Sequence, residues 1–233
     1  MLKSLIDHFR KKHYCAIHGI NFDEKRCLLL APHPDDELIG CGGTLIMHPK
    51  NFDVLCLATS GMHRQGQTPK ENSRVRFDDF TTIMSEIGVN RSFIFEYYEN
   101  GRCREFYPTM LNEYMKCVNV CDYNYIFLPH IHDNHPDHQY IVVLLKEMIK
   151  HQGYVADLKL VFYEVWSPLH NVNAYVSIDR VISDKCRFLK KYRTVGEGYA
   201  EPIKGLNRYR GLVCTYNEHN FLECFEVVDF YDH

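Results

Sequence analysis

The sequence has no apolar run long enough to span a membrane, for which about 20 such residues are needed. It also has no uninterrupted apolar stretch near its beginning of the kind typical of a secretory signal. Residues 1–12 instead place Leu2, Leu5, Ile6 and Phe9 at helical spacing among charged side chains, which predicts a short amphipathic helix. We therefore expect a cytoplasmic protein without a membrane partner.

Neither sign of charge dominates, because 27 Lys and Arg residues stand against 30 Asp and Glu residues. A net charge of −3 gives no electrostatic reason to expect a nucleic-acid partner. The ten cysteines include no Cys-x-x-Cys pair, so no structural zinc site is predicted. Several of them, such as Cys27, Cys56 and Cys214, lie in apolar runs, as small buried residues do. We expect free thiols in a reducing compartment.

The chain also lacks internal repeats and any linker rich in Pro, Gly or Ser, which predicts one domain over residues 1–233 with residues 1–25 as an N-terminal helical extension. Apolar segments of strand length alternate with segments of helical periodicity. This alternation predicts an α/β, Rossmann-like fold with a mostly parallel sheet flanked by helices. Strands are expected at 27–31, 52–59, 92–95, 125–128, 159–163 and 175–178, and helices at 72–87, 138–150 and 181–192.

Acidic residues and histidines follow two of the predicted strands. The run Pro32–Glu37 (PHPDDE) comes directly after the first strand, and the run His135–His138 (HPDH) comes shortly after the fourth. In parallel α/β sheets, binding sites form in the loops at the carboxyl ends of strands. We therefore expect both runs to contribute to one site.

The residue types in these runs are those of a catalytic zinc site, which takes three ligands from His, Asp, Glu or Cys and keeps a position for water. His33 and Asp36 are three residues apart, so a strand-to-helix turn can direct both inward while Asp35 points elsewhere. One ligand from the second run would complete a His-Asp-His set, which accepts Zn²⁺ or Fe²⁺. A spare carboxylate beside the metal suits a general base, and a spare histidine suits a group that polarises a carbonyl or protonates a leaving amine.

Each run also has a structural explanation. A lone His-Pro-Asp is usually a turn or a helix N-cap, and Asp35, Asp36 and Glu37 favour the start of a helix through capping and the helix dipole. For either run alone this explanation is the better one. Two such runs at strand ends of one alternating α/β chain favour the metal site.

With PHPDDE after the first strand and HPDH after the fourth, the chain resembles the PIG-L/LmbE family of zinc-dependent N-acetylglucosaminyl (N-acetyl sugar) deacetylases. The resemblance extends from about Cys27 to Phe225 and includes looser matches at Arg76–Asp79, Tyr209–Gly211 and Glu223–Phe225. It implies one zinc ion per chain, a small-molecule N-acetylated sugar as substrate, and release of acetate and a free amine.

The resemblance also implies a role for each residue of the two runs. The zinc ligands would be His33, Asp36 and His138. Asp35 would be the general base, and His135 would stabilise the oxyanion or act as an acid. Asp137 would orient one of the imidazoles, as carboxylates near metal sites commonly do, and Glu37 is expected to cap the helix.

Substrate-binding residues are expected in the loops after the second and third strands. Arg64 lies where family members place polar groups that bind substrate, although a solvated loop arginine explains it equally well. Asn100-Gly101 replaces the Asp-Gly of many members at a position expected to contact the sugar, and Arg193-Thr194 replaces their Ser-Gln. These differences leave the metal residues unchanged and concern the loops that shape the substrate pocket.

Three other features have two interpretations each. Trp166 could stack on a sugar ring or be buried in the core. His130 and His132 could line the pocket, although supporting or loop roles are favoured. The glycines in Gly40–Gly43 lack the GxGxxG or Walker spacing of a phosphate-binding loop, so we expect them to let a helix pack closely on the sheet and expect no nucleotide cofactor.

The sequence thus predicts a zinc-dependent hydrolase that removes an N-acetyl group from an amino sugar or glycoconjugate. A metal-dependent phosphoesterase is one alternative, and it would favour a second metal and a more basic pocket. A non-catalytic sugar- or metal-binding module is another, against which the complete His-Asp-His set with Asp35 argues. The sequence is compatible with a homo-oligomer and leaves the sugar undefined.

Overall fold

The computed structural model describes residues 17–60, 67–97, 102–194, 196–216 and 218–230. The helix predicted over residues 1–12 lies outside these ranges. The described part of the 1–25 extension contains a two-residue strand, β1 (His18–Gly19), which pairs with β7 (Ala174–Ser177). Within the described ranges, no helix combines the length and the apolar character that a membrane span requires.

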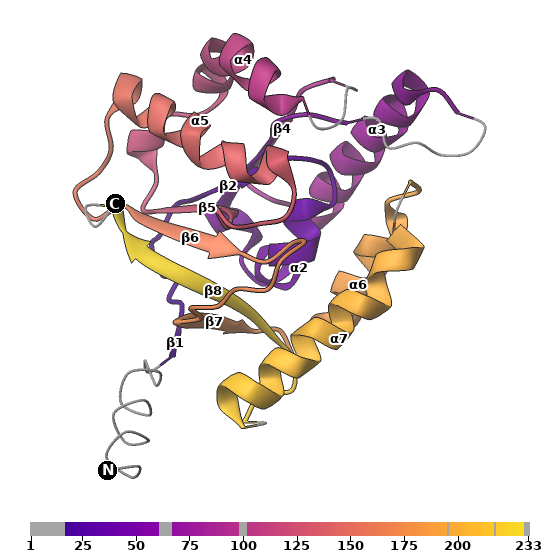
Figure 1. Ribbon diagram of the computed structural model, residues 1–233. Helices are drawn as coiled ribbons and strands as arrows, with labels where there is room; N and C mark the ends of the chain where they lie inside the picture. Colours follow the sequence, from indigo (N-terminus) through magenta and orange to yellow (C-terminus); the bar gives the residue numbers. More distant parts are fainter. Residues whose placement is uncertain (1–16, 61–66, 98–101, 195, 217, 231–233) are drawn as a thin grey trace, which may run out of the picture.

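Eight strands form one sheet in the order β1-β7-β8-β6-β5-β2-β3-β4 (Figure 1). The five strands at one end of this order, from β6 to the edge strand β4, are mutually parallel, and β8 (Leu222–Asp229) is inserted between β6 and β7, antiparallel to both. The predicted single α/β domain with a mostly parallel sheet is therefore confirmed. The parallel strands are β2 (Cys27–Ala31), β3 (Phe52–Cys56), β4 (Arg91–Ile94), β5 (Tyr125–Pro129) and β6 (Lys159–Tyr163).

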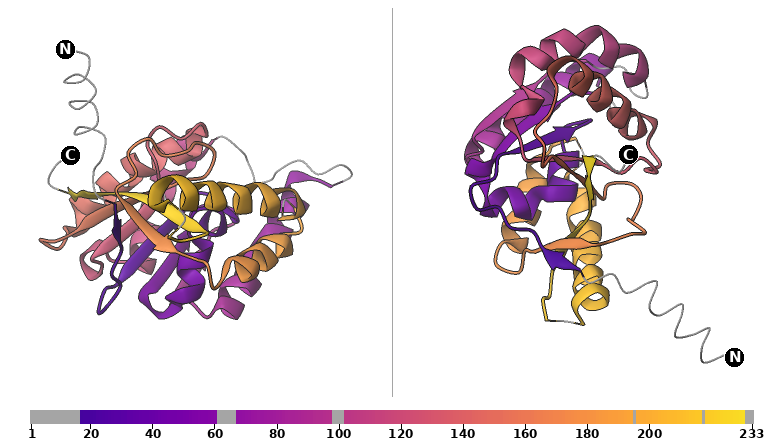
Figure 2. Two further views of the ribbon diagram at one scale, coloured as in Figure 1. Left: turned by 90° about the horizontal axis from the view of Figure 1, so that it is seen from below. Right: turned by 90° about the vertical axis from the view of Figure 1, so that its left-hand side faces the viewer.

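Helices cover both faces of this sheet (Figures 1 and 2). Side chains of a strand alternate between the two faces, so Leu29 of β2 packs in one core while Leu28 and Leu30 pack in the other. The first core is closed by α2 (Asp36–Met47), α3 (Pro69–Ile87), α6 (Ile182–Lys191) and α7 (Gly196–Thr215). The second is closed by α4 (Cys103–Cys117) and α5 (Pro136–Gln152).

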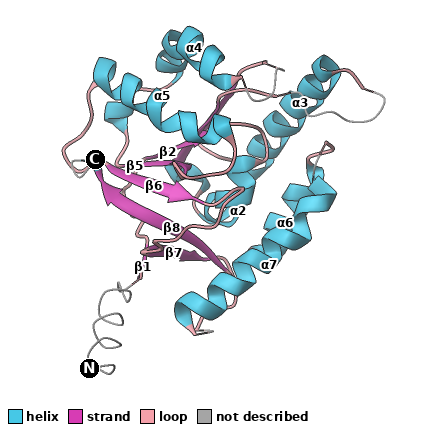
Figure 3. Cartoon of the chain, in the orientation of Figure 1, coloured by secondary structure: helices cyan, strands magenta, loops and turns pink. Residues whose placement is uncertain are grey.

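The strand order reverses between β2 and β5, which creates a crevice at their carboxyl ends. From β2 the chain proceeds through α2 to β3 on one side, and from β5 it proceeds through α5 to β6 on the other (Figure 3). Open α/β sheets bind ligands at such a switch point because the two loops diverge there. His33 follows β2 and His135 follows β5, so both histidine-containing runs reach this crevice.

Helix α2 packs against the sheet and its neighbours through glycines. A Cβ atom at Gly40 would lie 2.2 Å from Cδ2 of Tyr163, and a Cβ atom at Gly43 would lie 2.4 Å from Cγ2 of Ile178. No side chain fits at either distance without a shift of the helix. The expectation that these glycines serve close packing is met, and the same contact fixes the start of α2 at the crevice.

Replacing Gly40 with alanine is expected to destabilise the fold by about 1–3 kcal/mol, because the added methyl group overlaps the ring of Tyr163. Gly205 of α7 is a matched control, since a Cβ atom there meets no other atom within 4 Å. Alanine at Gly205 should stabilise the helix by about 0.5–1 kcal/mol. Urea unfolding measures both variants, and equal stability of the two would refute the close-packing explanation.

Candidate active site

The turn from β2 into α2 holds Asp35 in an unusual backbone conformation. Asp35 is the residue before α2 and has φ 111° and ψ −31°, a region that costs a non-glycine residue about 1–3 kcal/mol. Its side chain makes no capping hydrogen bond within the described chain and instead lines a cavity. The carboxylate of Glu37 accepts the backbone N–H of Asp35 at 3.0 Å and the hydroxyl of Tyr192. Glu37 thus holds the start of the helix, as expected. The carboxyl of Asp35 does not cap the helix and can face the cavity.

A buried arginine fixes the loops around Asp35. Arg76 of α3 donates from Nε to the carbonyl of Thr59 and from Nη2 to that of Pro34, each at 2.7 Å. Its Nη2 also lies 3.4 Å from Oδ1 of Asp35. Burial raises the pKa of Asp35 to about 7 although Arg76 opposes the shift. A carboxyl group with such a pKa can both accept and release a proton near neutral pH.

The carboxylate of Asp36 lies between the two histidines that were predicted to be ligands. Its Oδ2 is 3.4 Å from Nδ1 of His33 and 3.1 Å from Nε2 of His138. Each imidazole has a second carboxylate at its other nitrogen: Oδ2 of Asp137 lies 3.0 Å from Nε2 of His33, and Oδ1 of Asp133 lies 3.1 Å from Nδ1 of His138. Each ring therefore lies between two carboxylates, and the sequence predicted no role for Asp133.

This group of residues fits a divalent cation. Asp35, Asp36, Asp133 and Asp137 are each at most 3% exposed, and buried carboxylates require positive charge nearby. His138 is fully buried. Although both of its ring nitrogens lie near carboxylates, neither forms a hydrogen bond with a described residue. Burial lowers the pKa of His138, but Asp36 and Asp133 outweigh it and raise this pKa to about 9, so the carboxylates attract positive charge to this point.

His135 faces the same space from the start of α5. It is the N-cap of this helix, and its Nδ1 accepts the backbone N–H of Asp137 at 3.2 Å. A neutral ring bonded in this way carries its proton on Nε2. Burial and the neighbouring His33 and His138 lower the pKa of His135 to about 4, so the ring is neutral at pH 7. Ring nitrogens of these three histidines lie within 4.8 Å of one another.

The cavity at this site measures about 240 Å³, and two aromatic residues, Trp166 and Tyr199, are part of its lining. Trp166 is 42% exposed, so it is not a core residue, and its ring stands edge-on to Tyr199 of α7 at 5.3 Å. The backbone N–H of Trp166 donates to Oδ2 of Asp133 at 2.9 Å, which connects the aromatic pair to the histidine cluster. The cavity is lined by His33, Asp35, Asp36, Ser60, Arg76, His135, Trp166 and Tyr199.

Two of the predicted substrate-binding residues, Arg64 and Asn100, lie outside the described residues. Arg193, at the second position where the chain differs from the family pattern, donates from its backbone N–H at 2.9 Å and from Nε at 2.7 Å to Asp79 of α3. This arginine therefore ties the end of α6 to the helix that carries Arg76.

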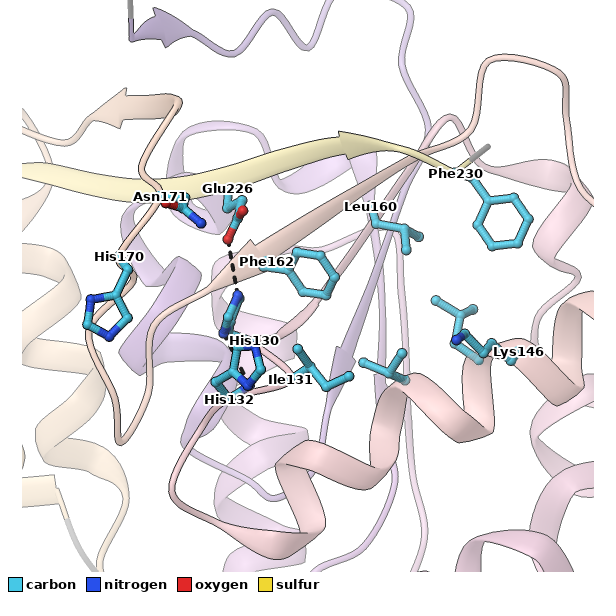
Figure 4. Close-up of a pocket in the computed structure, with 12 residues that line it drawn as sticks. His130, Ile131, His132, Lys146, Leu160, Phe162, His170, Asn171, Glu226 and Phe230 are labelled. Atoms are coloured by element: carbon cyan, nitrogen blue, oxygen red, sulfur yellow. Dashed lines mark hydrogen bonds and ion pairs between the residues drawn. The ribbon is translucent and has the colours of Figure 1, made fainter. Parts of the chain in front are cut away.

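His130 and His132 line a different cavity of about 270 Å³, between α5 and the strands β6 and β8 (Figure 4). Nε2 of His130 pairs with Oε2 of Glu226 on β8 at 3.1 Å, and its Nδ1 accepts the backbone N–H of His132 at 3.2 Å. The favoured interpretation of these histidines as loop residues agrees with these contacts.

Solved structures with the same fold include proteins of different activities. N,N'-diacetylchitobiose deacetylase from Pyrococcus horikoshii matches with a TM-score of 0.71 and 18% identity over 90% of this chain and 86% of that chain. GalB, the 4-carboxy-2-hydroxymuconate hydratase from Pseudomonas putida, matches with a TM-score of 0.70 and 15% identity over 88% and 96%. The conserved protein TT1542 from Thermus thermophilus matches with a TM-score of 0.66 and 22% identity over 86% and 93%. At such identities the likeness establishes the fold alone.

A comparison with curated proteins gave no match. The family model described as PIG-L, GlcNAc-PI de-N-acetylase, matches residues 28–149, which is just over half of the 233 residues. The matched segment contains both histidine-containing runs and Arg76. The chain therefore belongs to the PIG-L (GlcNAc-PI de-N-acetylase) family.

Proposed function

We propose that this chain is a metal-dependent deacetylase that hydrolyses the N-acetyl group of an amino sugar or glycoconjugate, with Zn²⁺ or Fe²⁺ in the site. The observation that carries the proposal is the position of Asp36, whose Oδ2 lies 3.4 Å from His33 and 3.1 Å from His138 at the switch point of the sheet. Membership of a de-N-acetylase family supports the type of bond that is broken.

His33, Asp36 and His138 are the proposed metal ligands, and Asp137 and Asp133 orient the two imidazoles from behind. A divalent cation held there would supply Lewis acidity toward the acetamide carbonyl and would lower the pKa of a water molecule. Side chains of the protein are proposed to transfer the protons and to stabilise the oxyanion.

Asp35 is proposed to accept the proton of the attacking water and to pass it to the leaving amine, which balances the reaction of amide and water to acetate and amine. Burial raises the pKa of this carboxyl, which favours its uptake of a proton from water. Arg76 holds its carboxyl in place. The Nε2–H of the neutral His135 is proposed to donate to the oxyanion that develops on the acetyl oxygen.

The cavity suits a small substrate group. Its volume of about 240 Å³ is below the range of about 300–1,000 Å³ of most ligand sites, so it matches an acetamido group with part of its sugar ring. Trp166 and Tyr199 are proposed to contact the apolar face of that ring. Arg64 and Asn100 stay proposed contacts to its polar groups.

Replacing Trp166 with alanine is expected to raise KM about 3–10-fold with little change in kcat, because it removes an aromatic contact worth about 0.5–1.5 kcal/mol and no proton-transferring group. Trp166→Phe should keep most of the affinity. Tyr209→Ala, at an exposed aromatic residue of α7 that does not line the cavity, is the control. Steady-state kinetics measure all three, and an unchanged KM in Trp166→Ala would remove Trp166 from the proposed substrate contacts.

The phosphoesterase alternative is disfavoured by the charge of the cavity. Among the described residues that line it, Arg76 is the only Lys or Arg. In the described part of the chain, the two groups spaced to hold a metal ion are His33, His135 and His138, and His33, Cys103 and Asp137. Both include His33, so neither is a second site separate from the proposed one.

The test is release of acetate and amine from free, nucleotide-linked and glycosidic N-acetylated sugars, run beside release of phosphate from phosphomonoesters. The proposal expects acetate from at least one sugar and one metal ion per chain by elemental analysis. Phosphate release without acetate release, or a protein that binds no divalent metal, would contradict it.

A further inference from the structure

Two thiols outside the candidate active site contact each other between α7 and β8. Sγ of Cys214 lies 3.8 Å from Sγ of Cys224. Cys214 stands in the last turn of α7 and is partly exposed, whereas Cys224 is 2% exposed in β8. The pair therefore joins a partly exposed cysteine to a buried one.

The surroundings of Cys214 favour its thiolate. Contact with Cys224 and the nearby Arg210 guanidinium lowers the pKa of Cys214 to about 7, although burial and the carboxylate of Glu164 oppose the shift. Arg210, one helical turn earlier on α7, is held by Glu164 and by the carbonyl of Leu169 at 2.9 Å. The positive charge next to this sulfur is thus fixed in position. A thiolate near a fixed cation is the reactive form of cysteine.

Another partly exposed cysteine lacks these features. Burial raises the pKa of Cys117, at the end of α4. Cys121, four residues later, donates its thiol hydrogen to the carbonyl of Gln152. Cys117 therefore provides an internal comparison for reactivity within the same molecule.

We propose that Cys214 and Cys224 form a reversible oxidation site for hydrogen peroxide, in which Cys214 reacts first and Cys224 completes a disulfide. The Cys214 thiolate attacks one peroxide oxygen, the O–O bond breaks, and the departing hydroxide takes a proton to become water. The sulfur of Cys224 then attacks the resulting sulfenic acid, the S–O bond breaks, and the hydroxide leaves as water with the Cys224 proton. The two thiols together lose two electrons, and one molecule of hydrogen peroxide takes them up and becomes two water molecules.

The new bond would join the last turn of α7 to β8. Helix α7 also carries Tyr199 and Arg210, and Arg210 pairs with Glu164 after β6. The proposal concerns oxidation chemistry alone and does not depend on the deacetylase activity.

The experiment treats the full chain with hydrogen peroxide, blocks the remaining thiols and maps peptides without reduction. We expect a peptide pair linked through Cys214 and Cys224, the loss of two free thiols per chain, and full recovery with dithiothreitol. Cys224→Ser should stop at a sulfenic acid on Cys214 that dimedone traps, whereas Cys214→Ser should leave Cys224 reduced. Cys117→Ser is the matched control and should behave as the wild type.

A second measurement uses only the wild-type protein and so does not depend on the folding of any variant. At pH 7, iodoacetamide should alkylate Cys214 at least roughly tenfold faster than Cys117, because more of Cys214 is thiolate. Equal alkylation rates, a peroxide-induced link to any other cysteine, or a wild-type pair that stays reduced while Cys117 is oxidised would each overturn the proposal.

Discussion

Replacing Asp35 with asparagine is expected to lower kcat roughly 10²–10⁴-fold, the usual contribution of a general acid–base group, while the protein still binds one metal ion. Asparagine has the same shape and can keep a contact with Arg76, but it cannot accept a proton from water. It also tolerates positive φ better than most residues, so the turn at Asp35 should persist. Acetate release and elemental analysis of the same preparation measure the two properties.

Asp157→Asn is the matched control, because it makes the same chemical change at an exposed position remote from the site in sequence. This control should leave kcat unchanged. Full activity in Asp35→Asn with the metal still bound would exclude Asp35 as the base.

Replacing His138 with alanine is expected to lower the metal content below about one-tenth of an ion per chain and to destabilise the protein. The change removes one proposed ligand, leaves the buried carboxylate of Asp133 without its imidazole partner, and leaves Asp36 with the imidazole of His33 alone. Loss of one partner from a buried ion pair costs about 3–5 kcal/mol. Elemental analysis and thermal unfolding measure both effects. Chelation of the wild type should lower its melting temperature in the same direction, because a ligand bound only to the folded state stabilises it.

His132→Ala is the matched control from the same segment, since His132 lines the other cavity (Figure 4). It should keep the full metal content. If His138→Ala binds metal as the wild type does, His138 is not a ligand.

The sequence predicted the strands and runs that carry the site because each is a local signal. The strands predicted at 27–31 and 159–163 match β2 and β6 residue for residue, since buried parallel strands read as short apolar runs bounded by polar residues. The position of both histidine-containing runs at strand ends followed from the same signal. Their meeting in one crevice followed from the general topology of parallel α/β sheets.

The parts that the sequence missed depend on tertiary packing. Helix α4 contains Pro108, and helix α7 contains Pro202 and several glycines, so local propensity argues against both. Tyr199 on α7 was therefore not expected near the site. The role of Asp133 was also hidden, because only the folded loop after β5 brings its carboxylate behind His138.

Titration of metal-free protein with Zn²⁺, followed by acetate release from the best sugar of the panel, is the most direct test of the proposed function. We expect the metal-free protein to be inactive and its activity to rise with added zinc to a plateau at one equivalent per chain. Asp35→Asn should bind the same equivalent without gaining activity. Acetate release at the full rate by the metal-free protein would contradict the proposed metal-dependent reaction.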